Sequence, residues 1–518
     1  MDETTRRCTT TGLAALRAAL AAWREALGPE QVINAGERLR LANQATFETA
    51  QRSEAILEPA DREEVAACLR IARRFGVPLY PVSTGRNWGY GSAVPARGGC
   101  VLLSLRRLDR VVDFHEELAY VTVEPGVTFR RLAAFLKERG SRLLPPLSGA
   151  GPDASVVGNV IERGIGKGPY EDMAARSCAY EVVLATGRVV RTGFAGLPGA
   201  AAAPLRAHGP GPSLQGLFNQ SNLGVVTRLT LWLDPAPAWR QLVVFPVRDA
   251  EGLAGVVDSL RAPLQRNGRG LQVELLNDYR LLAASRQFPY EEFDGLAPLP
   301  RGRVAEGLRP WGDARWAGGA TLWADSLEEL ELRRRALRSS LGQRVERLHC
   351  EEPAPGDDIS LAQDGLRPAY WRKRAHMPAD AHPDRDRCGV LWLTPVVPML
   401  GPAAAEVVGH IEETMFGHGF EPFISLRLTG GRSIQAVTGL FYDRDEPGAD
   451  ARAALCHAAL RETLYRRGLY PYRLGLCDMD SLPAGDDGGA ELLRGLKALL
   501  DPQGILAPGR YVPPSGGL

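Results

Sequence analysis

A glycine-rich stretch from Pro81 to Ala93 (Pro-Val-Ser-Thr-Gly-Arg-Asn-Trp-Gly-Tyr-Gly-Ser-Ala) contains the residue types that bind anions. Because glycine has no Cβ, successive backbone N–H groups in such a stretch can approach a phosphate closely. The spacing matches neither the Walker pattern nor the GxGxxG dinucleotide fingerprint. From these residues alone, an anion-binding loop and an ordinary structural turn are equally favoured.

The neighbouring elements predict how the chain holds this stretch. A helix is expected from Asp61 to Phe75, capped by Asp61 and ended by a glycine, and it leads into a strand over Val77–Val82. Strands over Cys100–Leu105 and Tyr120–Val123 follow, and then a helix from Thr128 to about residue 140. This order favours an α+β domain over a repeating βαβ one.

Further along, a second glycine-rich segment covers Ser155–Gly166, and Glu181–Gly193 reads as a hairpin turned at Thr186-Gly187. Pro235 and Pro237 mark a domain boundary, after which strands alternate with amphipathic helices. The polar segment Asp380–Arg387 is expected to be a loop or lid.

Composition limits the function classes. A chain of 518 residues exceeds the size of one hydrophobic core, so two or more domains are expected. Lys and Arg total 62 against 61 Asp and Glu, which provides no basic surface for nucleic acid or a membrane. The acidic start, the lack of an apolar run of ~20 residues, and eight scattered cysteines without a CxxC pair predict a cytoplasmic protein without a metal site.

Several segments together resemble the vanillyl-alcohol oxidase and p-cresol methylhydroxylase family of flavoproteins, in the family's order and spacing. The resemblance implies an α+β, two-domain fold: an FAD-binding domain over 1–238 and 469–518, with a cap domain over 239–468 inserted between them. The matching segments are Ser83–Pro95, Glu124–Phe129, Val157–Gly166 with Pro169 and Tyr170, Glu181–Gly193, Phe218–Leu233 and Asp501–Arg510.

The resemblance also implies which residues bind FAD. The first glycine-rich stretch would hold the pyrophosphate, the second would line the other side of the dinucleotide, Val183 would lie near the adenine, and Arg510 would lie near flavin N1 and O2. Arg163 as a structural ion-pair partner and Arg510 as a surface residue are the alternatives. The implied residues of the two stretches are Ser83, Thr84, Gly85, Arg86, Asn87, Gly89, Gly91 and Ser92 in the first, and Gly158, Asn159, Arg163 and Gly166 in the second.

Many family members attach FAD covalently through the cap. Val390 stands where the usual linking histidine is expected, whereas His382 falls at the position of the methylhydroxylase's linking tyrosine. His376 and Cys388 are neighbouring alternatives, and non-covalent FAD beside a solvated His382 is equally open.

For the substrate, the family pattern implies that Tyr90 and the pair Tyr472-Arg473 hold the oxygen of a para-substituted phenol. Two phenolic donors and a guanidinium favour the ionised phenol. The phenolate then assists hydride transfer from the benzylic carbon to flavin N5, leaving a quinone methide.

The chain departs from the family at the positions of the catalytic carboxylates. Ala150 falls where the oxidase has an aspartate near flavin N5, and Pro378 falls where the methylhydroxylase has its acidic cap residue. Asp153 or Asp380 are the candidate replacements as the base.

The leading interpretation is therefore an FAD-dependent oxidoreductase acting on a phenolic substrate, reoxidised by O2 or by an electron-carrier protein. The resemblance implies a homodimer. An alternative is oxidation of a non-phenolic alcohol or amine, with the Tyr and Arg residues binding another anion. A non-catalytic flavin-binding or interaction protein is the third reading.

Overall fold

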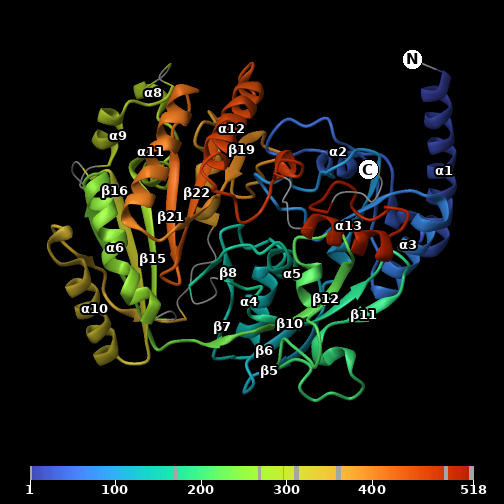
Figure 1. The fold of residues 1–518 in the computed structure, drawn as a ribbon, viewed down its shortest axis with the longest axis horizontal. Coiled ribbons are helices and arrows are strands. Elements are labelled where there is room, and N and C mark those ends of the chain that lie inside the picture. The colour runs from blue at the N-terminus through green and yellow to red at the C-terminus, as the bar shows by residue number, and fades with distance from the viewer. Residues whose placement is uncertain are drawn as a thin grey trace.

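The computed structural model describes residues 3–168, 172–266, 270–293, 295, 297–308, 314–357, 363–483 and 488–512. Figure 1 shows two bodies side by side, with the earlier residues and the C-terminal segment in one body and the middle of the chain in the other. Pro169 and Tyr170, which contribute to the family resemblance, lie outside the described residues.

The first body contains two sheets. A four-stranded sheet, in the order β1 (Val32–Ile33), β2 (Ser53–Leu57), β4 (Cys100–Ser104) and β3 (Leu79–Val82), is covered by α1 (Glu3–Leu27) and α3 (Arg62–Phe75). The prediction for α3 is confirmed: the Asp61 side chain accepts a hydrogen bond from the Glu64 N–H, and Gly76 ends the helix at a φ of 65°. The glycine-rich stretch leaves the sheet at the carboxyl end of β3. Because β3 pairs in parallel with β4, the carboxyl ends of both strands lie at this edge of the sheet.

A five-stranded sheet completes this body. It is packed against α4 (Phe129–Glu138), capped by Thr128, and α5 (Val156–Ile161), capped by Ser155. The second glycine-rich segment therefore contains a short helix. The strands, in sheet order, are β11 (Val189–Arg191), β10 (Ser177–Val183), β12 (Val225–Trp232), β6 (Tyr120–Val123) and β5 (Val111–His115).

The second body is built on a nine-stranded antiparallel sheet. Along β15 buried residues alternate with partly exposed ones, so one face packs on helices and the other stays polar. The polar face contacts the first body, because the Gly168 N–H donates to Gln272 and Arg427 donates to the Gly166 carbonyl. The strands are β14 (Trp239–Val247), β15 (Leu271–Asn277), β16 (Trp316–Ala324), β17 (His349–Cys350), β18 (Ala354–Pro355), β19 (Cys388–Leu393), β20 (Val396–Pro398), β21 (Phe423–Thr429) and β22 (Ser433–Asp443).

Four long helices cover the apolar face of that sheet: α6 (Ala250–Arg266), α10 (Leu327–Leu341), α11 (Gly401–Gly417) and α12 (Ala449–Tyr465). The remaining elements are short: α2 (Glu37–Ala42), β7 (Leu143–Leu144), β8 (Leu147–Ser148), β9 (Gly166–Lys167), β13 (Asp234–Pro235), α7 (Asp278–Ser285), α8 (Tyr290–Phe293) and α9 (Arg301–Gly307). None of the helices in the described ranges is long and apolar enough to cross a membrane.

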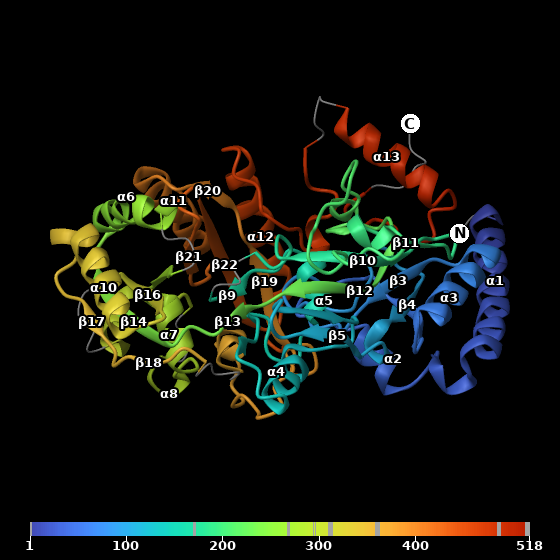
Figure 2. The ribbon, with the colours of Figure 1, turned by 90° about the horizontal axis from the view of Figure 1, so that it is seen from below.

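The C-terminal segment returns to the first body. After α13 (Gly489–Leu500), which lies far from the nine-stranded sheet in Figure 2, the chain runs beside β3. The Leu79 N–H donates to the Ile505 carbonyl and the Ala507 N–H donates to the Leu79 carbonyl, both at 2.8 Å. This return brings Arg510 to the glycine-rich stretch. The limits 1–238, 239–468 and 469–518 remain our proposal for the domains.

Candidate functional site

A cavity lies at the carboxyl end of β3 and is lined by the run Ser83–Asn87. Within the described part of the chain, none of the backbone N–H groups from Thr84 to Asn87 donates a hydrogen bond. Uncommitted N–H groups around a cavity can bind the oxygens of a phosphate. Ser92 also lines this cavity, although its hydroxyl donates to the Asp384 carboxylate at 2.7 Å.

Two glycines of the same loop serve packing instead. At Gly89, with a φ of 79°, a Cβ would stand 2.1 Å from the Trp392 ring, and at Gly91, with a φ of 123°, it would stand 2.8 Å from Leu476. The Gly89 N–H is already donated to the Thr46 hydroxyl. A side chain at Gly89 would separate the loop from Trp392 of the cap, and one at Gly91 would separate it from Leu476 of the C-terminal segment, so these two glycines fix the packing of the loop.

The opposite wall comes from α5 and the loop before it. Gly158 and Asn159 line the cavity beside Ala150, and the Asn159 side-chain oxygen is buried without a hydrogen-bond partner. A Cβ at Gly158 would stand 3.2 Å from the Ser83 hydroxyl, a tight contact that the Ser83 side chain would have to relieve by a small shift.

Three further residues of the expected FAD set lie elsewhere. Arg163 has a φ of 51°, is exposed, and lines a different cavity together with Arg427 and Tyr472. Gly166 lies in β9, and Val183 is a fully buried core residue of β10. The structure therefore does not bring these three to the cavity of the glycine-rich loop.

Glu162 joins two arginines at the end of the cavity. Its carboxylate accepts a hydrogen bond from Arg510 at 2.5 Å and from the Tyr511 hydroxyl at 3.2 Å, and it lies 3.7 Å from the Arg473 guanidinium. Burial alone would raise the pKa of Glu162, but the charges of Arg510 and Arg473 hold it below its usual value. Our sequence reasoning missed Glu162, although it lies inside the second glycine-rich segment.

The three residues expected to hold a phenol are neighbours. The Arg473 guanidinium lies 4.0 Å from the centre of the Tyr90 ring and donates to the Asn87 side chain at 2.7 Å, and the Tyr90 hydroxyl lies 3.5 Å from the Thr394 hydroxyl. Burial and the adjacent Tyr472 raise the pKa of Tyr90, so its hydroxyl remains a donor at neutral pH. Arg473 is buried and keeps its charge beside Tyr472, Tyr90 and Glu162.

Neither candidate base lies at this cluster. Asp153 is paired with Arg130 at 2.7 Å, and that pairing lowers the pKa of Asp153. Asp380 is exposed and paired with Arg385, which lowers its pKa as well. Both carboxylates are held ionised by arginines and neither lines the cavity, although Asp153 lies 3.9 Å from Arg86, which does; the assignment of either as the base stays a prediction.

The possible linking residues differ sharply in environment. His382 lines a smaller cavity with Thr84 and Gly85, and its ring packs edge-on against Trp88 at 5.5 Å. Burial and the charge of Arg86 lower the pKa of His382, which keeps the ring neutral. Among the alternatives, His376 is exposed and Cys388 is completely buried.

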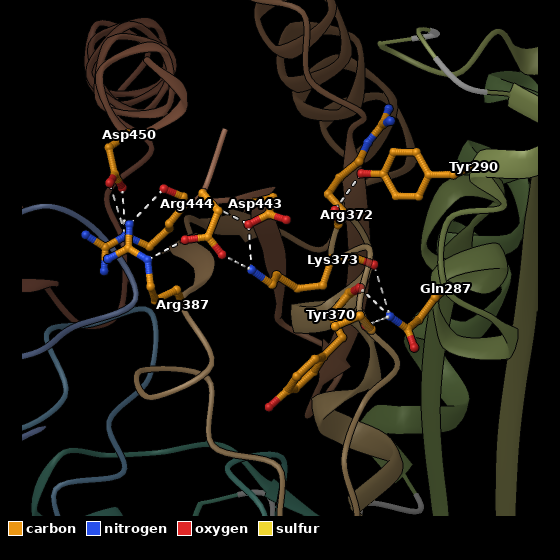
Figure 3. A network of polar contacts seen from close by, with 11 residues as sticks. Gln287, Tyr290, Tyr370, Arg372, Lys373, Arg387, Asp443, Arg444 and Asp450 are labelled. Atoms are coloured by element: carbon orange, nitrogen blue, oxygen red, sulfur yellow. Dashed lines mark hydrogen bonds and ion pairs between the residues drawn. The ribbon is translucent and has the colours of Figure 1, made fainter. Parts of the chain in front are cut away.

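Polar contacts fix the loop that carries His382. Figure 3 shows Lys373 reaching Asp443 at 2.6 Å; it also donates to Asp445 at 2.6 Å, and Asp445 in turn accepts from Arg387. Closer to the glycine-rich loop, buried Asp384 accepts hydrogen bonds from Ser92 and, at 3.0 Å, from the Trp88 ring nitrogen. The loop is therefore held against both the cap and the glycine-rich stretch.

Comparisons with known proteins agree with this geometry. Residues 53–193 match the FAD binding domain family. The chain is 42% identical to 1'-carboxy-chondrochloren decarboxylase of Chondromyces crocatus over 96% of this chain and 97% of that protein. It is 26% identical to the 4-cresol dehydrogenase (hydroxylating) flavoprotein subunit of Pseudomonas putida over 94% of both. A structure of p-cresol methylhydroxylase with substrate bound shares the fold, with a TM-score of 0.88 at 24% identity over 98% of each chain.

The fold, the cavity and these matches define the class: the protein is an FAD-dependent oxidoreductase. The residues present fit the cofactor, because free N–H groups, an unpartnered amide oxygen on Asn159 and the Arg510 guanidinium face one cavity. More narrowly, the chain belongs to the vanillyl-alcohol oxidase and p-cresol methylhydroxylase family of FAD-linked oxidases.

Proposed function

We propose that this enzyme oxidises the benzylic carbon of a para-substituted phenol. The observation that carries the proposal is the cluster of Tyr90, Tyr472 and Arg473 beside Asn87 of the glycine-rich loop. Bound FAD supplies an acceptor for a hydride, that is, for two electrons and a proton.

The protein residues act on the phenolic oxygen. Tyr90 and Tyr472 donate hydrogen bonds to it, and Arg473 offsets its negative charge, so the substrate binds as a phenolate and releases its proton to solvent. Electron release from the phenolate stabilises the developing quinone methide. Because the site is buried, these interactions are stronger than they are in water.

Some details of the reaction follow from relatives only. O2 or an electron-carrier protein would reoxidise the flavin, and a homodimer is our expectation for the assembly. The 42% identical relative is named as a decarboxylase of a carboxylated compound, which favours a second version of the same chemistry. In that version the quinone methide carries a carboxylate on the carbon next to the benzylic carbon, and this carboxylate leaves as CO2.

Anaerobic mixing of the purified protein with para-substituted phenols, alcohols and amines tests the proposal. We expect 4-ethylphenol and related phenols to bleach the flavin, and alcohols and amines without a phenol to leave it oxidised. Bleaching by non-phenolic alcohols or amines, with no response to phenols, would favour the alternative substrate class.

We further propose that His382 forms the covalent bond to FAD, because its neutral ring lines a cavity shared with the glycine-rich loop. We expect the denatured protein to carry the mass of FAD and His382→Ala to lose that mass while FAD still binds. Since His376 is exposed and lies on the same loop, His376→Ala is the matched control and should keep the mass. An unshifted mass in the unmodified protein would show that the cofactor is held non-covalently.

A further inference from the structure

Arg280 is a cation in the cap that forms no ion pair in the described part of the chain, although the charge of Glu274 partly offsets the effect of burial on the pKa of Arg280. It lies in the first turn of α7, where the Asn277 side chain accepts a hydrogen bond from the Arg280 backbone N–H and so fixes the backbone. In the described part of the chain, the Arg280 guanidinium makes no hydrogen bond and no ion pair. One of its terminal nitrogens is completely buried without an acceptor.

Such an arrangement is unfavourable unless something compensates it. Burying an ionised group without a partner costs several kcal/mol, and burial lowers the pKa of Arg280. Arg301 on the neighbouring helix shows the usual solution: it also lies against two aromatic rings, but it is paired with Glu412. Arg280 as a whole residue is only partly buried, although one of its terminal nitrogens is not exposed.

The surroundings of Arg280 connect it to the reaction site. Its guanidinium lies 5.7 Å from the ring centres of Trp392 and Phe441, whose faces attract a cation. Trp392 in turn packs on Gly89 and donates its backbone N–H to the Gly89 carbonyl at 3.3 Å. The Trp392 indole therefore contacts both Arg280 and Gly89, the loop residue that precedes Tyr90.

We propose that Arg280 binds a carboxylate carried by the phenolic substrate, on the carbon next to the benzylic one. This rests on the proposed function and specifies its substrate class. The phenolic oxygen would lie at Tyr90 and Arg473, and the carboxylate would lie beyond Trp392 at Arg280. A carboxylate supplies acceptor oxygens for the unpartnered Arg280 guanidinium and a negative charge in direct contact with it.

With the carboxylate at Arg280, the proposed reaction is a hydride transfer followed by loss of CO2. The benzylic carbon gives up a hydride to bound FAD and becomes the exocyclic carbon of a quinone methide. The bond from the adjacent carbon to the carboxylate then breaks, its electron pair forms a carbon–carbon double bond and restores the phenolate, and CO2 leaves. Arg280 acts before this step by fixing the carboxylate, and the Trp392 and Phe441 rings limit water around it.

Two probes that differ in the carboxylate test Arg280: 3-(4-hydroxyphenyl)propanoate and 4-propylphenol, each mixed anaerobically with the holoenzyme. In Arg280→Gln we expect the affinity for the propanoate, taken from the concentration dependence of flavin reduction, to fall about 10- to 100-fold. Reduction by 4-propylphenol should be unchanged or faster, and Arg280→Lys should recover part of the loss. An equal effect on both probes, or on neither, would overturn the assignment.

Arg301→Gln is the matched control, because it removes a cation that faces aromatic rings in the same cap but already has a partner. It should leave the ratio of the two probes unchanged. A third probe, 3-phenylpropanoate, has the carboxylate but no phenol, and its binding is followed as a shift of the flavin absorbance. Loss of that shift in Arg280→Gln supports the carboxylate site even if no phenol reduces the enzyme, whereas an unaltered shift counts against it.

Discussion

Arg473→Ala is expected to slow anaerobic flavin reduction by a para-substituted phenol about 10²- to 10³-fold, the usual effect of removing one preorganised donor from a reaction site. Arg473 is the only residue of the proposed phenol cluster with a positive charge, and it lies 4.0 Å from the Tyr90 ring. Without it the phenolate loses its counter-charge in a buried site, where an unpaired anion is unfavourable.

The measurement is stopped-flow reduction across a pH range. If Arg473 stabilises the phenolate, the variant should need a higher pH for half-maximal reduction, because more of the substrate must ionise in solution. The FAD content should change little, since Asn159, Arg510 and the loop from Thr84 to Asn87 remain.

Tyr90→Phe provides a milder variant for comparison with Arg473→Ala. It removes one neutral donor and leaves the charge, so phenol-dependent reduction should weaken less than in Arg473→Ala, with FAD still bound. If Arg473→Ala loses FAD but reduces normally once it is reloaded, Arg473 belongs to the cofactor site alone.

The glycine-rich loop shows what the sequence could predict about this site. Glycine spacing identifies a loop of unusual backbone, and the structure has positive φ at Gly85, Gly89 and Gly91. Glycine spacing does not show which glycines contact a ligand and which are needed for packing. The neighbours that decide this, Trp392 and Leu476, are hundreds of residues away in the sequence.

The sequence analysis did not identify Glu162 or Arg280 for the same reason: distant parts of the chain decide their surroundings. Glu162 becomes recognisable only when the C-terminal segment brings Arg510 beside it, and Arg280 only when the fold buries one of its nitrogens without a hydrogen-bond acceptor. Asp153 is the opposite case: its position in the chain suggested a base, but Arg130 of α4 captures it. Local patterns predicted α3 and α4, whereas charge pairing depends on tertiary contacts.

A large loss of stability is expected when the buried ion pair of the C-terminal segment that carries Arg510 is broken. Lys497 in α13 is 1% exposed, and its ammonium group donates to Asp501 at 2.7 Å and to the carbonyls of Asn222 and Leu506 at 2.8 Å. Asp501, also 1% exposed, accepts the backbone N–H of Leu506 as well. This buried pair connects α13, the first body and the turn that leads to Arg510.

Lys497→Met is expected to destabilise the protein by about 3–5 kcal/mol, because it removes one partner of a buried pair and leaves the charge of Asp501 uncompensated. Denaturant unfolding of the holoenzyme, followed by flavin fluorescence and by circular dichroism, measures this loss. FAD should dissociate at lower denaturant concentrations than those that unfold the nine-stranded sheet, because the segment bearing Arg510 loosens first.

The double variant Lys497→Met with Asp501→Asn separates charge from packing. It removes both charges, so it should recover part of the stability lost in Lys497→Met alone. If the double variant is less stable than the single one, the Asp501 carboxylate matters through the hydrogen bonds that it accepts from the Ile505 and Leu506 backbone N–H groups, and not through the ion pair. Recovery in the double variant would show that the position of Arg510, and with it the proposed flavin site, depends on charge compensation at a buried pair that lies outside every glycine-rich segment.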